Sequence, residues 1–115
     1  MSHVKVSKID DIVVLAPRGQ LVGGDETTEL EQNLKDLAVE GNKKLIIDLG
    51  DVDFVNSWAL GVLIGGHVNY SKREGHIKLA NMSKRIDQLL VITKLVRIFE
   101  MYETVEEASK EFPDS

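Results

Sequence analysis

The chain contains no cysteine, which excludes disulfides, thiolate metal sites and cysteine nucleophiles together. Its histidines, His3, His67 and His76, lack the close spacing and the partner ligands of a zinc site, so we expect no bound metal. The glycines that precede Asp25 are not followed by the lysine of a phosphate-binding loop. A G-x-S-x-G nucleophile motif is also missing. We therefore expect no cofactor and no catalytic residue, and the sequence does not predict an enzyme.

Long apolar runs are missing as well. No stretch approaches the ~20 residues that span a bilayer. The N-terminal residues lack the basic start and apolar run of a secretory signal. We expect a cytoplasmic protein that does not insert into a membrane.

Basic residues are fewer than acidic ones: the chain has 14 Lys and Arg against 19 Asp and Glu, and its net charge is −5. This balance argues against a nucleic-acid-binding protein, which normally carries a basic excess. The basic residues Lys84, Arg85, Lys94 and Arg97 are accordingly expected to form a solvated surface. The 115 residues are enough for one domain, and 43% of them are hydrophobic, so we expect a single domain spanning residues 1–115 with a real core.

Several short β-branched or apolar runs predict strands. The first two should form a hairpin around the Asp10-Asp11 turn, and the continuous run at residues 45–49 should be covered on both faces, as in a parallel or mixed sheet. The predicted strands cover residues 4–9, 12–15, 45–49, 77–80 and 98–102.

Helical periodicity fills the segments between these strands. Asp25 is the expected N-cap of the first helix and Gly41 its C′ residue, whereas Ser83 and Thr104 are expected to cap the last two helices. The alternation predicts an α/β fold with a mixed sheet of four or five strands and with helices mainly on one face.

The segment from Leu45 to Gly66 is the most informative part of the sequence. A buried strand leads through a short loop, residues 50–55, into a helix over residues 56–73. Asn56 and Ser57 are both N-cap residue types, which places Ser57 at the helix N-terminus. Free N–H groups and the positive end of the helix dipole gather there, so a phosphate on Ser57 would be tolerated.

The helical wheel of this second helix predicts two faces. The face expected to pack on the sheet carries Leu60, Leu63, Ile64, His67 and Ser71. The opposite face carries Trp58, Val62, Gly65, Gly66, Asn69 and Arg73. Helical glycines cost about 1 kcal/mol each relative to alanine, so the close approach of another backbone is expected to explain some of them.

The stretch Phe54-Val55-Asn56-Ser57-Trp58-Ala59-Leu60-Gly61-Val62-Leu63 resembles the signature of the STAS domain, named for sulphate transporters and anti-sigma factor antagonists. The Gly19-Gln20-Leu21 turn and the order of elements extend the resemblance over nearly the whole chain. It implies a STAS-like single domain and a bacterial regulator. In that family an anti-sigma factor, which is a serine kinase, phosphorylates the serine found here as Ser57, and a phosphatase reverses the modification. The unphosphorylated form binds the anti-sigma factor and so frees the sigma factor.

The sequence departs from the family pattern at three places. The acidic residue before the serine is Asn56, the following Ser/Thr and Gly are Trp58 and Ala59, and Val22 or Gly23 stands where the family has an acidic residue. The resemblance implies a partner-binding site, and we expect it to contain Gly23, Gly24, Asn56, Ser57, Trp58 and Val62.

Two alternatives to a phosphorylation switch follow from these departures. One is a STAS scaffold or subunit that binds its partner constitutively, as in a stressosome-like or lipid-transport assembly. The other is a small-ligand or nucleotide sensor that uses the glycine-rich loop.

Overall fold

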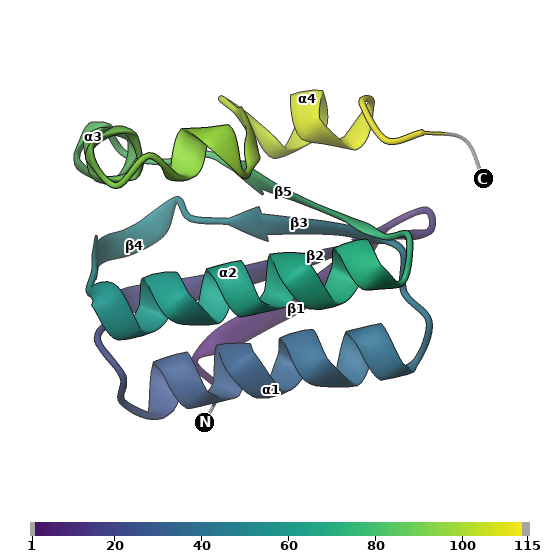
Figure 1. Ribbon diagram of the computed structural model, residues 1–115, viewed down its shortest axis with the longest axis horizontal. Helices are drawn as coiled ribbons and strands as arrows, with labels where there is room; N and C mark the ends of the chain where they lie inside the picture. The colour runs from purple at the N-terminus through teal and green to yellow at the C-terminus, as the bar shows by residue number, and fades with distance from the viewer. Residues whose placement is uncertain (1, 114–115) are drawn as a thin grey trace.

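The computed structural model describes residues 2–113, in which an opening hairpin is followed by helices and strands in turn, except that two strands, residues 44–48 and 51–55, follow one another directly (Figure 1). The strands are β1 (Val4–Ile9), β2 (Ile12–Leu21), β3 (Lys44–Asp48), β4 (Asp51–Val55), β5 (His76–Ala80) and β6 (Glu100–Tyr102). The helices are α1 (Asp25–Val39), α2 (Ser57–Lys72), α3 (Lys84–Ile92) and α4 (Val105–Ser109), with a 3-10 turn, η1 (Leu95–Arg97).

The strands form one mixed sheet in the order β1-β2-β3-β5-β6, in which β1 is antiparallel to β2 and the other pairings are parallel. Strand β4 lies off this path and pairs with the second half of β2, Arg18 to Leu21. The sheet of the described residues therefore has six strands instead of the four or five predicted. The prediction of a loop over residues 50–55 is wrong, because residues 51–55 form strand β4. The strand was not predicted because aspartate is depleted in strands, and exposed Asp51 and Asp53 flank buried Val52.

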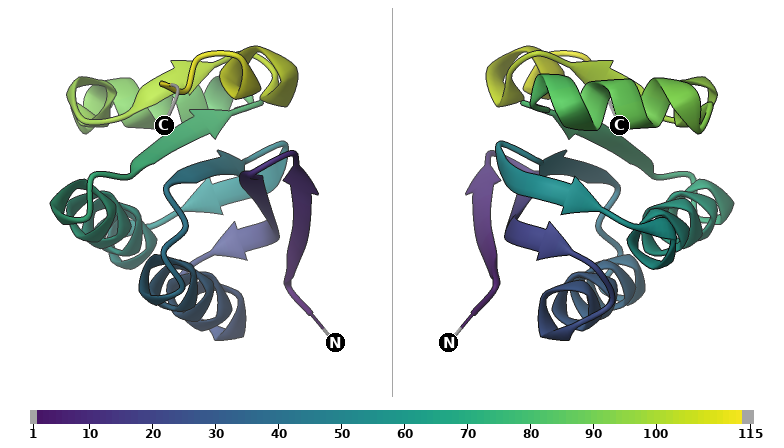
Figure 2. Two further views of the ribbon diagram at one scale, coloured as in Figure 1. Left: turned by 90° about the vertical axis from the view of Figure 1, so that its right-hand side faces the viewer. Right: turned by 90° about the vertical axis from the view of Figure 1, so that its left-hand side faces the viewer.

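The helices lie mainly on one face of the sheet, as predicted. Residues of α1, α2 and α3 join the larger core cluster on that face, and Figure 2 shows α1 and α2 side by side against the strands. The short helix α4 covers the opposite face, where Ala108 packs with Ile12, Val14 and Ile46. No helix within residues 2–113 is long and apolar enough to cross a membrane.

Local capping chemistry fixes most of the helix ends. The side chains of Ser83 and Thr104 accept hydrogen bonds from the first turns of α3 and α4, and Gly41 adopts a φ of 88° just beyond α1. The expectation that Asp25 caps α1 is wrong. Gly24 is the N-cap residue, and Asp25 is the first helical residue, where its carboxylate faces the positive end of the helix dipole.

Helix α2 packs through a different face from the one predicted. Its buried residues are Ala59, Val62, Leu63, Gly66 and Tyr70. The true face is rotated from the predicted one by about 100°, the turn of one residue. The reason is that α2 has neighbours on two sides. Helix α1 covers one flank, and on the other flank the ring of His67 meets that of Phe99 at 5.3 Å.

Candidate functional site at the start of helix α2

The start of α2 is tied to the end of β2 by Asn56. Its main-chain N–H donates to the carbonyl of Leu21 at 3.0 Å, and its side-chain Nδ2 donates to the carbonyl of Val22 at 3.0 Å. Its Oδ1 accepts from the N–H of Ala59 at 3.1 Å and so caps the helix. Because β2 and β4 are parallel, they end at the same edge of the sheet, and Asn56 joins the two chain ends there.

The loop from β2 to α1 is shaped by Gly23, whose φ of +93° favours glycine. Its N–H donates to the hydroxyl of buried Thr27 at 2.9 Å. That hydroxyl donates in turn to the carboxylate of Glu26 at 2.6 Å, which lowers the pKa of Glu26 below its ordinary value. A Cβ at position 23 would lie 3.4 Å from the ring of Trp58, so the indole packs directly against this loop.

Four exposed side chains surround this junction, and we call them the α2 corner: Val22, Phe54, Ser57 and Trp58. Ser57 is the first residue of α2, and no acidic residue lies in the first turn of that helix. Trp58 is 65% exposed although it also contacts Gly23. The corner thus presents a hydroxyl within a largely apolar surface at the positive end of a helix dipole.

A groove of about 610 Å³ runs from this corner between the two long helices, and we call it the α1–α2 groove. Its open shape comes from Gly61 and Gly65, since a Cβ at either position would meet nothing within 4 Å. Gly66 differs, because a Cβ there would lie 3.0 Å from a methyl of Leu34 on α1. The groove is lined by Glu31, Leu34, Lys35, Ser57, Trp58, Gly61, Val62, Gly65, Gly66 and Asn69.

The structure brings most of the predicted site residues together. Asn56, Ser57, Trp58 and Gly23 meet at the corner, whereas Gly24 caps α1 beside the side chain of Glu26. Val62 was expected on the outward face of α2 and this is wrong: it is only 7% exposed and forms part of the groove floor.

Sequence reasoning missed the α1 wall of the groove, formed by Glu31 and Lys35, and the exposed ring of Phe54. The spacing of Glu31 and Lys35, four residues apart on one face of α1, is the signal that could have placed them together.

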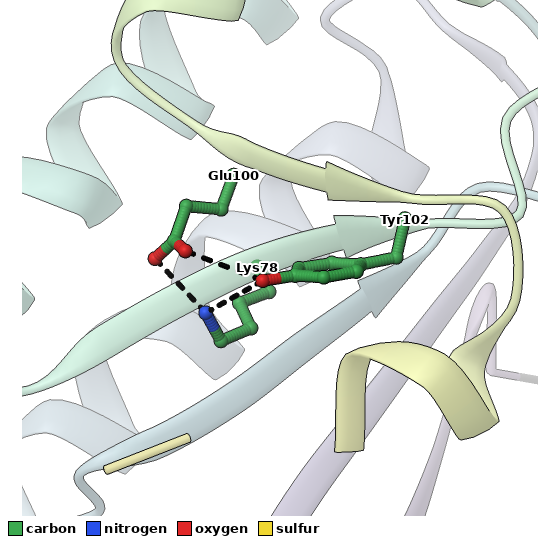
Figure 3. A network of polar contacts seen from close by, with 3 residues as sticks. All are labelled: Lys78, Glu100 and Tyr102. Atoms are coloured by element: carbon green, nitrogen blue, oxygen red, sulfur yellow. Dashed lines mark hydrogen bonds and ion pairs between the residues drawn. The ribbon is translucent and has the colours of Figure 1, made fainter. Parts of the chain in front are cut away.

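A second polar cluster lies on the opposite face of the sheet, around the buried ammonium of Lys78 (Figure 3). Its Nζ donates to Glu100 at 2.9 Å and to the hydroxyl of Tyr102 at 3.3 Å. It also lies 5.1 Å from the ring centre of Tyr102 and 5.0 Å from that of Phe112. The ion pair lowers the pKa of Glu100, and the two rings close over the charge. We attribute a structural role to this cluster, because it fastens the C-terminal segment to the sheet.

Within residues 2–113 no group of three or more His, Asp or Glu side chains could hold a metal ion. The candidate site consists of the α2 corner and the adjoining groove.

Comparison with known proteins decides the family. The model of the STAS domain family matches residues 3–108. The chain belongs to the STAS domain family. A Thermotoga maritima protein named as a candidate anti-sigma factor antagonist is 27% identical over 103 residues, 90% of this chain and 91% of that protein. The crystal structure of a candidate anti-sigma factor antagonist from Thermotoga maritima matches with a TM-score of 0.86 over 94% of this chain and 92% of that one.

Two further similar proteins extend the comparison. The anti-sigma-B factor antagonist of Bacillus subtilis is 38% identical over 72 residues, 63% of this chain and 65% of that protein. The unphosphorylated form of the anti-sigma factor antagonist SpoIIAA has a TM-score of 0.74 at 15% identity, covering 94% of each chain, and this likeness shows the fold alone.

Proposed function

We propose that this STAS protein is a regulatory protein-binding module of the anti-sigma factor antagonist kind, and that its partner docks on the α2 corner. The observation that carries the proposal is the exposure of Trp58 and Ser57 side by side at the mouth of the α1–α2 groove. Tryptophan dominates binding energy at many interfaces, and an indole supported from below by Gly23 is held in place before binding. Relatives named as anti-sigma factor antagonists support this class of partner.

The proposed partner is an anti-sigma factor that is itself a serine kinase, with Ser57 as its substrate. A phosphate on Ser57 would add about −1.5 to −2 charges at the helix N-terminus, where the dipole favours an anion. The fold would therefore tolerate the modification. The interface would not tolerate the phosphate, because the new charge would have to lose water beside Trp58 when the partner docks, which costs binding free energy. SpoIIAA, which shares the fold, is known in a phosphorylated form, and a phosphatase would be needed to reset such a switch.

One observation favours the alternative of a constitutive STAS scaffold or subunit. Asn56 uses both ends of its amide, donating to Val22 and accepting from Ala59. The aspartate that the family pattern has at this position could not donate to Val22. Asn56 thus holds the loop after β2 in place with a hydrogen bond that an aspartate could not donate. In the family pattern, this position instead carries a carboxylate beside the phosphorylated serine.

Binding of the Ser57 variants to the anti-sigma factor kinases of the source organism separates these two functions. Wild type, Ser57→Ala, Ser57→Asp and Trp58→Ala would be titrated calorimetrically, with phosphate transfer from labelled ATP followed in parallel. Ser71→Asp, an exposed serine at the other end of α2, is the matched control.

The switch predicts that Ser57→Ala binds, that Ser57→Asp binds at least tenfold more weakly and that only chains retaining Ser57 are labelled. Equal binding of both Ser57 variants without labelling would identify the scaffold. Undiminished binding of Trp58→Ala would show that the corner is not the interface.

A further inference from the structure

A second exposed apolar surface lies on α3 and the turn that follows it. Val91, Ile92, Val96 and Ile98 are all exposed, and Ile92 at 76% is among the most exposed apolar side chains of the described residues. We call these four residues, with their basic neighbours described below, the α3–η1 surface. Single exposed aliphatic residues are ordinary, but four within eight residues form a cluster that calls for an explanation.

None of these four side chains belongs to the main hydrophobic core, although Val96 and Ile98 are only 37% and 39% exposed. The inward positions of the same segment are filled by Ile86, Leu90, Leu95 and Phe99, all of which are buried in the main core. Polar side chains at the four outward positions would therefore leave the core unchanged. Aliphatic side chains at positions that the core does not require indicate a role outside folding.

Basic residues outnumber acidic ones on α3 and η1. Lys84, Arg85, Lys94 and Arg97 are all exposed, and residues 88–99 contain two basic residues and no acidic one. Asp87 is the one acidic residue of α3, and Glu103 lies near it and Lys84, so the basic excess is greatest around Lys94 and Arg97. In a chain with a net charge of −5, this segment is a local basic region with an apolar centre. Its electrostatic complement is an acidic partner.

We infer that the α3–η1 surface is a second docking site, and that its occupant is an acidic protein segment with aliphatic or aromatic anchors. The anchors would cover Ile92 and its apolar neighbours, and acidic groups would pair with the surrounding lysines and arginines. This site is distinct from the α1–α2 groove, because α3 packs on β4 and η1 whereas the groove lies between α1 and α2 (Figure 1).

Two other occupants fit the charges less well. A symmetric pairing with a second copy would place the same patch on both sides, so Lys94 and Arg97 would face like charges. An anionic lipid surface would attract these residues but repel the rest of a chain that carries a net charge of −5. An acidic segment of limited size can sit over Lys94 and Arg97, away from Asp87, and avoids both penalties.

The test uses a defined probe, a capped 16-residue peptide with leucine and glutamate at helical spacing, titrated into the full chain by calorimetry and NMR. We expect binding that shifts the amide signals of residues 84–98 and weakens severalfold when salt is raised from 50 to 500 mM. The same peptide with lysine in place of glutamate should not bind.

Two variants locate the site without risk to the fold. Ile92→Gln alters an exposed helical side chain, and Lys94→Gly places glycine where the backbone φ is +63°, a conformation that glycine favours. Each should weaken peptide binding at least fivefold. Val39→Gln, a valine of matching 74% exposure at the end of α1, should change it less than twofold. Trp58→Ala should not change it, which keeps this test independent of the α2 corner.

Three results would overturn the inference. The first is a lack of peptide binding, or binding that Ile92→Gln leaves intact. The second is sedimentation of the chain with phosphatidylserine vesicles that depends on Ile92, which would assign the surface to lipid. The third is self-association in analytical ultracentrifugation that Ile92→Gln abolishes, which would assign it to a second copy.

Discussion

The glycines of α2 give the sharpest test of how the α1–α2 groove is built. Gly61 and Gly65 lie inside the helix and line the groove, and a Cβ at either position would meet nothing within 4 Å. Replacing glycine by alanine inside a helix gains about 0.8–1 kcal/mol of stability. The double variant Gly61→Ala, Gly65→Ala should therefore raise the free energy of unfolding by up to about 2 kcal/mol. For a chain of this length that corresponds to a rise in Tm of about 8 °C.

Gly66 provides the matched control, because it has the same helical backbone but a different environment. A Cβ there would lie 3.0 Å from a methyl of Leu34, which is itself buried. Overpacking of this kind costs about 1–3 kcal/mol, which exceeds the propensity gain. Gly66→Ala should therefore lower the free energy of unfolding by about 1 kcal/mol.

Urea unfolding followed by circular dichroism would measure the free energy of unfolding of Gly61→Ala, Gly65→Ala, their double variant and Gly66→Ala. The two added methyl groups should also narrow the groove, so the stabilised double variant should bind a partner of the α2 corner more weakly. If Gly61→Ala and Gly65→Ala destabilise the chain, or if Gly66→Ala stabilises it as much as they do, the assignment of open and closed positions along α2 is wrong.

Three further predictions concern single side chains. Asn56→Asp should lower the free energy of unfolding by about 1 kcal/mol in urea, because the carbonyl of Val22 loses its donor while the helix cap remains; an unchanged midpoint would contradict this. Trp58 is the sole tryptophan, so iodide should quench its fluorescence readily in the free protein, and complete protection would refute its exposure. The ion pair with Lys78 lowers the pKa of Glu100 below 4.5, so its contribution to stability is present above that pH and is lost as the pH falls further. Glu100→Gln should therefore destabilise the chain at pH 7, and its difference from wild type should shrink as the pH falls through the lowered pKa of Glu100; a difference that does not change with pH would point to packing instead of charge.

Elements set by neighbouring residues could be predicted from the sequence. The capping roles of Ser83 and Thr104 and the turn at Gly41 depend on side chains or backbone within a few positions, and the structure contains all three. The alternation of helices and strands likewise gave the correct fold class.

Features that depend on distant segments could not be predicted. Strand β4 exists because it pairs with the second half of β2, some thirty residues earlier, and its Asp51 and Asp53 give no strand signal. The buried face of α2 was misjudged because apolar residues and glycines occur almost all round the helix. The candidate site shows the same division: the place of Ser57 and Trp58 at the start of α2 could be predicted from the sequence, whereas the α1 wall of the groove could not.

The double pairing of β2 has a consequence for recognition. Its first half is hydrogen-bonded to β3 and its second half to β4, so the segments that end at residues 21 and 55 form one stiff unit. Asn56 then links these segments across their ends. A surface built on such a unit is preorganised and loses little conformational entropy when a partner binds. Differences in affinity at a preorganised surface arise mainly from the dissociation rate. For the proposed interface, exchange of the side chains at 57 and 58 should thus alter how long a complex lasts while the scaffold beneath them stays the same.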